Sequence, residues 1–364
     1  MTQLVGWVSA PNIRGTISLI HGCLATIIIC TWNALHLNIP ADKDSVSRKV
    51  LRHIQWMVIG ILAPELVSMS ALRERPPAAL MVNPVRSDVS PKSWTLTHAQ
   101  YVNMGGFSLV FSNDSRYRLN APQFLALLSN DCIKLPRISE RDIQDKSNAD
   151  SFQKTFACLQ IGWFLSYVAS RAIQQLPVTT LELFTVGFIS CTFFTYGGWW
   201  HKPKDVDVPT DIHTHDTFES LQTLLGEHTN RYQEPRIRIG IMDNLGSDRT
   251  GMGIFKLVLI LPMLTFGASH LLGWNTHFNS KIETILWRTC SIGCLSLPLV
   301  IFVVSQLSTV RKMRSASIAV FMPEVLYICL RLYLVVEVFL GLRKVPSAVY
   351  DDVHWTQFVP HLGS

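Results

Sequence analysis

One glutamate in this sequence lies where an acid could act in a dry environment. Glu65 sits in the apolar run 56–72, directly after Pro64. A carboxyl group at that depth in a hydrocarbon layer is costly, so it is a candidate functional group. Pro64 allows a helix to bend there, and an unpaired carboxyl group in apolar surroundings is expected to stay protonated. Glu65 could therefore be a general acid, or it could bond to a neighbouring helix in a packed bundle.

A second Pro-Glu step lies near the other end of the chain, at Pro323 and Glu324. Glu324 and Arg331 are seven residues apart, which places them on one helical face, and Tyr327 lies between them on nearly the same face. The three side chains could form a proton relay or a polar seam between helices. Either interpretation gives Glu324 partners on its own helix. Glu65, by contrast, has no basic residue within two turns on its own helix.

A third carboxylate, Glu182, lies in an apolar run that follows the run containing Arg171. A tight turn around Leu176 and Pro177 joins the two runs, so both charges are expected at a similar depth. They could form an ion pair that locks the hairpin, or Glu182 could be a second reaction carboxylate.

Aromatic side chains accompany these acids. Trp199, Trp200 and Trp274 lie at the ends of apolar runs, as expected of an interfacial belt. Trp32 and Trp163 lie deeper. Their ring faces could stabilise a carbocation, although core packing explains them equally simply.

Signatures of metal and cofactor chemistry are missing from the sequence. There is no D-D-x-x-D or N-D-x-x-D cluster for magnesium diphosphate, no Walker A, G-x-G-x-x-G, G-x-S-x-G or H-E-x-x-H motif, and no C-x-x-C pair among the eight cysteines. One short polar cluster, 213–216, contains two histidines and an aspartate, which is a weak metal signal. We therefore predict no metal site and no cofactor.

The elements that must position these residues are membrane helices. The chain has 364 residues, 48% of them hydrophobic, and a mean hydropathy of +0.24, which is too apolar for an ordinary soluble domain. We predict an all-α polytopic transmembrane bundle whose partner is the lipid bilayer. The clear spans, seven in number, are 16–37, 53–72, 155–173, 178–200, 253–273, 289–310 and 318–342. The segment 98–111 is an eighth candidate, as a short span, a re-entrant segment or an interfacial helix.

The charge distribution bears on the orientation of this single membrane domain, 1–364. The net charge of +6 comes from loop residues, so the positive-inside rule explains it better than nucleic-acid binding does. Eight spans with an outside N-terminus place the polar loops 112–154 and 201–252 in the cytoplasm, and seven spans with an inside N-terminus are the alternative. Under the first topology the glycosylation sequon at Asn113 stays unmodified.

A set of short motifs extends over about the first 210 residues. They are Trp7, Pro11, Arg14-Gly15-Thr16, Cys30-Thr31-Trp32, His36 to Pro40, Ala63-Pro64-Glu65, Trp94 with His98, Met104 to Phe107, Asp145 to Ser147 with Ala149-Asp150, Trp199-Trp200 and Lys202-Pro203. Together they resemble a large family of filamentous-fungal multi-pass membrane proteins. Some members resemble the membrane-bound terpene cyclases of meroterpenoid clusters, which protonate an epoxide or olefin without metal. His21 and Asn12-Ile13 depart from the family pattern, which leaves the substrate open.

The resemblance and the acids together predict a metal-free cyclase of fungal secondary metabolism. It would act on a lipophilic prenylated or epoxidised small molecule in the endoplasmic reticulum or another endomembrane. The predicted catalytic residues are Glu65, Glu182 and Glu324, and the predicted substrate contacts are Trp32, His98, Trp163, Tyr327 and Arg331. The alternative is a non-catalytic membrane protein, either a transporter or a structural component of the endomembrane. The sequence carries no signal for an oligomeric state.

Overall fold

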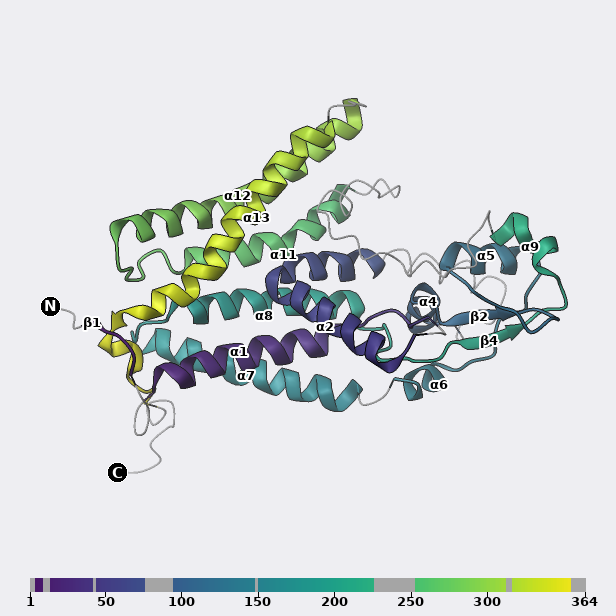
Figure 1. Ribbon diagram of the computed structural model, residues 1–364, viewed down its shortest axis with the longest axis horizontal. Coiled ribbons are helices and arrows are strands. Elements are labelled where there is room, and N and C mark those ends of the chain that lie inside the picture. The colour runs from purple at the N-terminus through teal and green to yellow at the C-terminus, as the bar shows by residue number, and fades with distance from the viewer. Residues whose placement is uncertain are drawn as a thin grey trace.

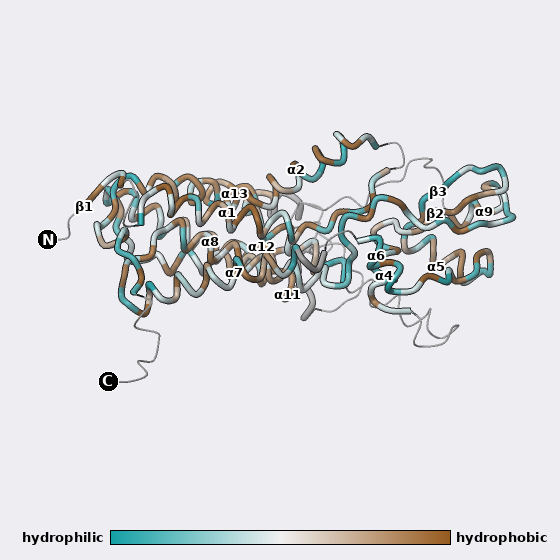
Figure 2. The backbone as a smooth tube through the Cα atoms, turned by 90° about the horizontal axis from the view of Figure 1, so that it is seen from below, coloured by the Kyte–Doolittle hydropathy of each residue, from teal (hydrophilic) through white to brown (hydrophobic). Residues whose placement is uncertain are grey.

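A computed structural model describes residues 4–8, 14–41, 44–75, 94–147, 150–225, 253–311 and 316–354. These residues form a long bundle of helices with a smaller mixed α/β lobe at one end (Figure 1). Apolar stretches follow the bundle helices, and more hydrophilic segments gather in the lobe (Figure 2). The two parts have separate hydrophobic cores.

Six long helices of alternating direction build the bundle (Figure 1). They are α1 (Thr16–Ala34), α7 (Asp150–Ile173), α8 (Thr180–Trp199), α11 (Gly253–Leu271), α12 (Lys281–Arg311) and α13 (Ala316–Leu340). At the end far from the lobe, strand β1 (Leu4–Val5) pairs antiparallel with β5 (Val345–Pro346). The short 3₁₀ helices Gly341–Arg343 and Ser347–Tyr350 flank β5 at the same end.

Several bundle helices are long and apolar enough to cross a membrane. Within the described ranges there are four: Thr16–Ala34, Gln153–Ile173, Lys281–Val304 and Phe321–Arg343. Large apolar side chains are exposed on them, among them Leu159 at 68% and Ile282 at 70%, as expected of faces that contact lipid. Helices satisfy their own backbone hydrogen bonds, which a spanning segment requires.

The prediction of seven clear spans is not confirmed. Threonines, glycines and Glu182 lower the hydropathy of α8, which is buried on most sides by its neighbours. The apolar part of α11, Leu257–Leu271, is shorter than a typical span. Both helices nevertheless lie within the bundle beside the four candidates (Figure 1).

The predicted span 53–72 is bent into a helical hairpin. Helix α2 (Val46–Leu62) and the helix Pro64–Arg75 meet at an angle of 111°, because proline cannot continue the hydrogen-bond ladder of α2. Lys49 in α2 pairs with Asp207 at 2.6 Å, and Glu74 in the second helix pairs with Lys202 at 2.8 Å. Both arms therefore contact the segment that leaves α8 toward the lobe.

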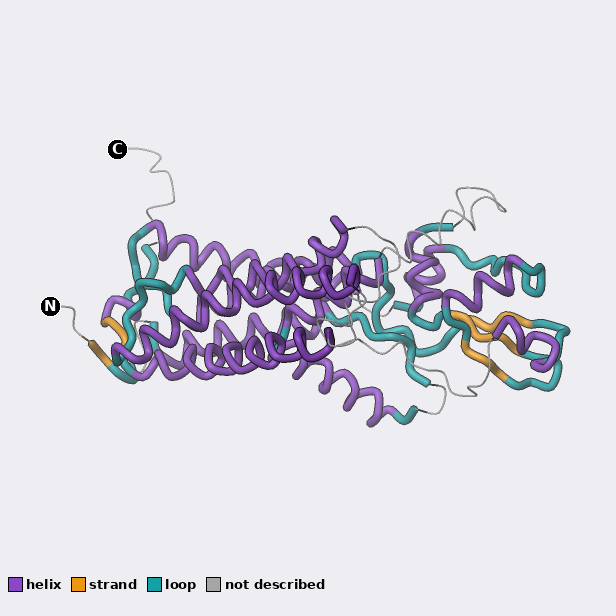
Figure 3. The backbone as a smooth tube through the Cα atoms, turned by 90° about the horizontal axis from the view of Figure 1, so that it is seen from above, coloured by secondary structure: helices purple, strands orange, loops and turns teal. Residues whose placement is uncertain are grey.

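The lobe combines short helices with a small sheet (Figure 3). Its elements are α4 (Leu96–Asn103), β2 (Phe107–Val110), β3 (Arg116–Arg118), α5 (Ala121–Ser129), α6 (Glu140–Asp145), β4 (Thr210–His213) and α9 (Phe218–Leu225). The strand order is β3-β2-β4, with β2 antiparallel to β3 and parallel to β4. The two predicted polar loops thus meet across β2.

The predicted eighth segment, 98–111, is not a span. It is divided between α4 and β2, and Gly105 between them has a φ of 82°, a conformation that glycine adopts readily. Tyr101 and Phe107 from its two halves pack edge to face, with ring centroids 5.2 Å apart, in the core of the lobe. The apolar residues of this segment therefore serve a small α/β core, and the prediction of an all-α fold holds only for the bundle.

Candidate functional site

The bend between α2 and the next helix delivers Glu65 into the bundle core. Its side chain is fully buried, at 0% exposure. The hydroxyl group of Tyr327 donates a hydrogen bond to Oε1 of Glu65 at 2.9 Å, and Nε of Arg331 lies 3.6 Å from the same oxygen. Glu65 thus has two partners, both from α13, which agrees with the alternative of a bond to a neighbouring helix.

The local structure explains why these three side chains meet. Tyr327 and Arg331 are four residues apart, so they share one face of α13. Glu65 lies in the first turn of the helix Pro64–Arg75, where the free N–H groups and the helix dipole favour a carboxylate. Two helices from distant parts of the chain therefore direct complementary groups at one point.

The guanidinium group of Arg331 is surrounded mainly by aromatic rings. Its Cζ lies 3.8 Å from the ring centroid of Phe266 and 5.2 Å from that of Phe184, which are cation–π distances. Among the described residues, Oε2 of Glu65 and the three guanidinium nitrogens of Arg331 have no hydrogen-bond partner. Three kinds of interaction therefore hold the cluster together: the ion pair of Glu65 with Arg331, the hydrogen bond from Tyr327, and the cation–π contacts of Arg331.

Glu324 does not organise Tyr327 and Arg331 as predicted. Its side chain is half-buried on α13, whereas Tyr327 and Arg331 are buried and directed to Glu65. The helical face was identified correctly, but its carboxylate partner comes from another helix.

A small cavity adjoins Pro64, the residue before Glu65. This cavity of about 20 Å³ is lined by Gly60, Pro64 and Thr195 among others, which is room for about one water molecule. Glu65 itself does not line it. The buried carboxyl group is therefore enclosed by side chains in this conformation.

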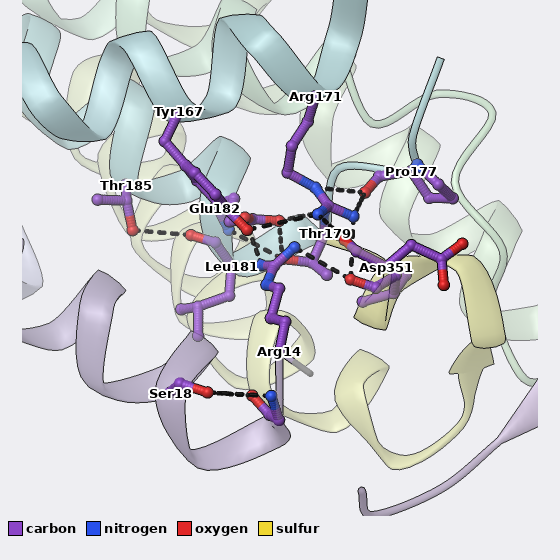
Figure 4. A network of polar contacts seen from close by, with 12 residues as sticks. Arg14, Ser18, Tyr167, Arg171, Pro177, Thr179, Leu181, Glu182, Thr185 and Asp351 are labelled. Carbon is purple, nitrogen blue, oxygen red and sulfur yellow. Dashed lines mark hydrogen bonds and ion pairs between the residues drawn. The ribbon is translucent and has the colours of Figure 1, made fainter. Parts of the chain in front are cut away.

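Glu182 belongs to a second polar network, at the end of the bundle far from the lobe (Figure 4). Thr179 caps α8, and its backbone N–H and its hydroxyl group each donate to Oε2 of Glu182 at 2.8 Å. Nη2 of Arg14 donates to Oε1 at 2.5 Å. The carboxylate is thus bound on both oxygens, by a capping box and by an ion pair.

The predicted ion pair between Arg171 and Glu182 is replaced by that with Arg14. The Arg171 guanidinium group is fully buried and donates to four backbone carbonyl oxygens. These belong to Pro177, Ala348, Val349 and Asp351. Arg171 therefore fixes the segment 348–351 onto the turn between α7 and α8. It supplies the hydrogen-bond donors that backbone carbonyl groups at the ends of helices need.

A cavity of about 750 Å³ adjoins this network. It is bounded by α7, α8, the loop after α11 and the segment 341–349. Its lining residues are Leu165, Val168, Ala169, Ala172, Pro177, Val178, Thr179, Thr180, Leu183, Val186, Leu272, Asn275, Thr276, His277, Gly341, Leu342, Val345, Pro346 and Val349. A largely apolar pocket of this size with a few polar groups is typical of a ligand site.

The remaining predicted site residues lie apart from Glu65. Trp32 is 41% exposed at the end of α1, its ring centroid 4.1 Å from that of His53, and Trp163 is 62% exposed on α7. His98 caps α4 in the lobe, stacks on Trp94, and its Nε2 lies 3.0 Å from the carbonyl oxygen of Ile138. Of the predicted residues, the structure brings together Glu65, Tyr327 and Arg331.

Sequence reasoning missed Arg14 and the residues that line the larger cavity. One signal was present, because Thr179-x-x-Glu182 matches the capping-box pattern and predicts a carboxylate turned toward a helix start. Arg14 had no such signal, since its contact with Glu182 joins residues 168 positions apart.

The comparisons with known proteins identify a family without assigning a role. The model described as "Family of unknown function (DUF8562)" matches residues 1–228 and 217–362. The chain belongs to this family. The Glu65 cluster and the larger cavity both lie within the matched residues. No curated protein matches the chain, and no solved structure does.

Proposed function

We propose that this chain is a membrane protein that binds a lipophilic small molecule in the 750 Å³ cavity. The cavity itself carries the proposal, because its volume and mainly apolar lining suit a ligand of lipid or drug size. Two lining residues, Ala169 and Ala172, are exposed on α7. The cavity therefore opens on the side of the bundle, where a ligand dissolved in the bilayer would enter.

Filling the cavity tests this function. The protein is purified in a mild detergent, and small molecules extracted from it are identified by mass spectrometry. Ala172→Phe places a ring in the cavity wall and is expected to remove the co-purifying compound. Ser166→Phe adds the same ring at an exposed position of α7 that does not line the cavity, so its extract should match that of the wild type. Equal extracts from all three proteins would reject the site.

A second candidate function is the metal-free cyclisation of a prenylated or epoxidised substrate, with Glu65 as the acid. The observation that favours it is the buried cluster with Tyr327 and Arg331, in which Oε2 of Glu65 lacks a hydrogen-bond partner among the described residues. Substrate space at Glu65 would require the helix Pro64–Arg75 to move away from α8. Glu182 and Glu324 are the proposed further carboxylates of this reaction.

Microsomes from a heterologous fungus test the cyclase proposal. Wild-type microsomes should convert an epoxyprenyl phenol, and microsomes with equal amounts of the Glu65→Gln variant should not. Wild-type conversion by the variant would remove Glu65 from the reaction. An absence of conversion by the wild type would favour the binding function, or a transport or structural role.

We also propose an endomembrane location, such as the endoplasmic reticulum. The apolar bundle helices support membrane insertion. Co-localisation of a fluorescent fusion with an endoplasmic reticulum marker tests the compartment, and a signal confined to the plasma membrane would contradict it.

A further inference from the structure

The polar residues that line the 750 Å³ cavity gather at one end of the bundle, and the inner part of the cavity is apolar. The apolar lining residues Leu165 and Val186 lie about two helical turns inside the ends of α7 and α8. Asn275, Thr276 and His277 line it from the loop after α11, at the end of the bundle. A ligand that satisfies both ends must be an amphiphile, because a wholly apolar molecule would leave polar groups without partners.

The polar end has free hydrogen-bonding capacity. Asn275 and His277 are exposed, and their side chains make no hydrogen bond or ion pair with the described residues. Amide and imidazole groups can both donate hydrogen bonds. The loop therefore offers donors to a headgroup without breaking an existing contact.

The wall behind this end carries an excess positive charge. Arg14 and Arg171 both donate to the carbonyl oxygen of Val349, at 3.1 and 2.9 Å, and Val349 lines the cavity. Glu182 is the one buried carboxylate of this network, and it pairs with Arg14. The carboxylate of Asp351 is exposed and directed away from the guanidinium groups (Figure 4). One guanidinium charge is thus left without a carboxylate partner in the network.

Elsewhere at this end, the buried carboxyl group of Glu337 accepts a hydrogen bond from the hydroxyl group of Tyr333. Arg343 forms an ion pair with Glu283 at 2.9 Å. Guanidinium groups stay charged in proteins, and water screens a buried charge only weakly. The guanidinium charge of Arg171 behind Val349 therefore attracts a negative group at the polar end of the cavity.

We infer that the cavity takes an anionic amphiphile, with its chain between α7 and α8 and its negative headgroup at Asn275 and His277. This inference rests on the ligand site proposed above. It adds the sign of the headgroup charge and the direction in which the ligand lies.

Three probes with one chain length test the inference: hexadecanoate, hexadecanol and hexadecylamine. Their binding to the purified full-length protein in a nonionic detergent is measured by competition against a fluorescent fatty acid. Hexadecanoate is expected to bind about tenfold more tightly than the alcohol, which is the effect of one partly screened charge interaction, and the amine is expected to bind most weakly.

Charge reversal at the rim sharpens the test. His277→Glu, at an exposed position, should weaken hexadecanoate binding about tenfold and leave hexadecanol binding unchanged. His201→Glu, on the exposed segment after α8, is the matched control and should alter neither. Equal binding of the three probes to the wild type would overturn the headgroup inference while keeping the lipophile site. Binding of none of them would contradict the site itself.

Discussion

At the scale of single residues, the buried pair of Glu65 and Arg331 combines attraction with incomplete hydrogen bonding. Removing both charges from water is costly, and their attraction offsets that cost only when the geometry is good. Here Nε and Oε1 are 3.6 Å apart and further polar atoms lack partners among the described residues. The bundle core therefore holds a charge pair that contributes little net stability but is costly to break.

This balance predicts a distinctive double-mutant cycle. Glu65→Ala leaves Arg331 buried without its carboxylate and should lower the free energy of unfolding by about 3 kcal/mol. The double variant Glu65→Ala with Arg331→Met removes both charges and should recover most of that loss. Thermal unfolding in detergent measures both. Glu283→Ala breaks the exposed pair with Arg343 and should cost less than about 1 kcal/mol. A double variant less stable than the single one would contradict the account.

The residues of this cluster were only partly predictable from the sequence. The apolar run around Glu65 and the helical spacing of Tyr327 and Arg331 indicated buried polar groups on known faces. Which face meets which depends on helix packing between residues 262 positions apart, and no local pattern encodes that. For the same reason the partner of Glu182 was assigned to the adjacent hairpin arm, where Arg171 lies.

At the scale of elements, the helix Pro64–Arg75 approaches α8 closely at one of two adjacent glycines. A Cβ atom on Gly198 would lie 2.3 Å from the backbone of Ala71, whereas one on Gly197 would meet nothing within 4 Å. The hydroxyl group of Ser68 also donates to the backbone oxygen of Cys191 on α8, at 2.7 Å. The absence of a side chain at Gly198 is thus what lets the second arm of the hairpin pack on α8.

Alanine at the two glycines should have opposite effects. Gly198→Ala should force the arm away from α8 and lower the free energy of unfolding by about 2 kcal/mol, as overpacking does. Gly197→Ala should raise it by up to about 1 kcal/mol, because alanine favours a helix more than glycine does. Thermal unfolding of the purified variants compares them. Similar losses for both would mean that the close approach does not matter.

The type of an element was predictable where the apolar pattern is long. The prediction failed where the elements are short. The runs at 155–173 and 318–342 correspond to α7 and α13. The run 53–72 has the composition of a span, but hydropathy does not report direction, and the bend at Pro64 reverses the chain. In the lobe, the elements are only three to nine residues long, and the sheet depends on pairing between β2 and β4, which lie about a hundred residues apart.

At the scale of the whole molecule, six helices of alternating direction bring β1 and β5 to one end and the lobe to the other (Figure 1). If all six cross a membrane, the lobe lies on one side and the strand pair on the opposite side. Basic residues such as Lys49, Arg116 and Lys202 lie at the lobe end, so the positive-inside rule predicts a cytoplasmic lobe.

Cysteine labelling in sealed microsomes checks this orientation. In a Cys132→Ser background, Asn113→Cys in the turn between β2 and β3 should react with a membrane-impermeant maleimide. Asp352→Cys, at the opposite end, should react only after permeabilisation. Both positions are exposed, so access depends on the side of the membrane. Reaction of both without permeabilisation would contradict an odd number of crossings between the lobe and the strand pair.

The pairing of β1 with β5 also bears on how the protein is made. The wall of the larger cavity includes residues 341–349, and Arg14 reaches the backbone of Val349 across 335 positions of sequence. The ribosome delivers these residues after the helices that form the other walls. A nascent chain can therefore insert those helices in order, but the wall of the cavity is complete only when residues 341–349 fold back onto Arg14.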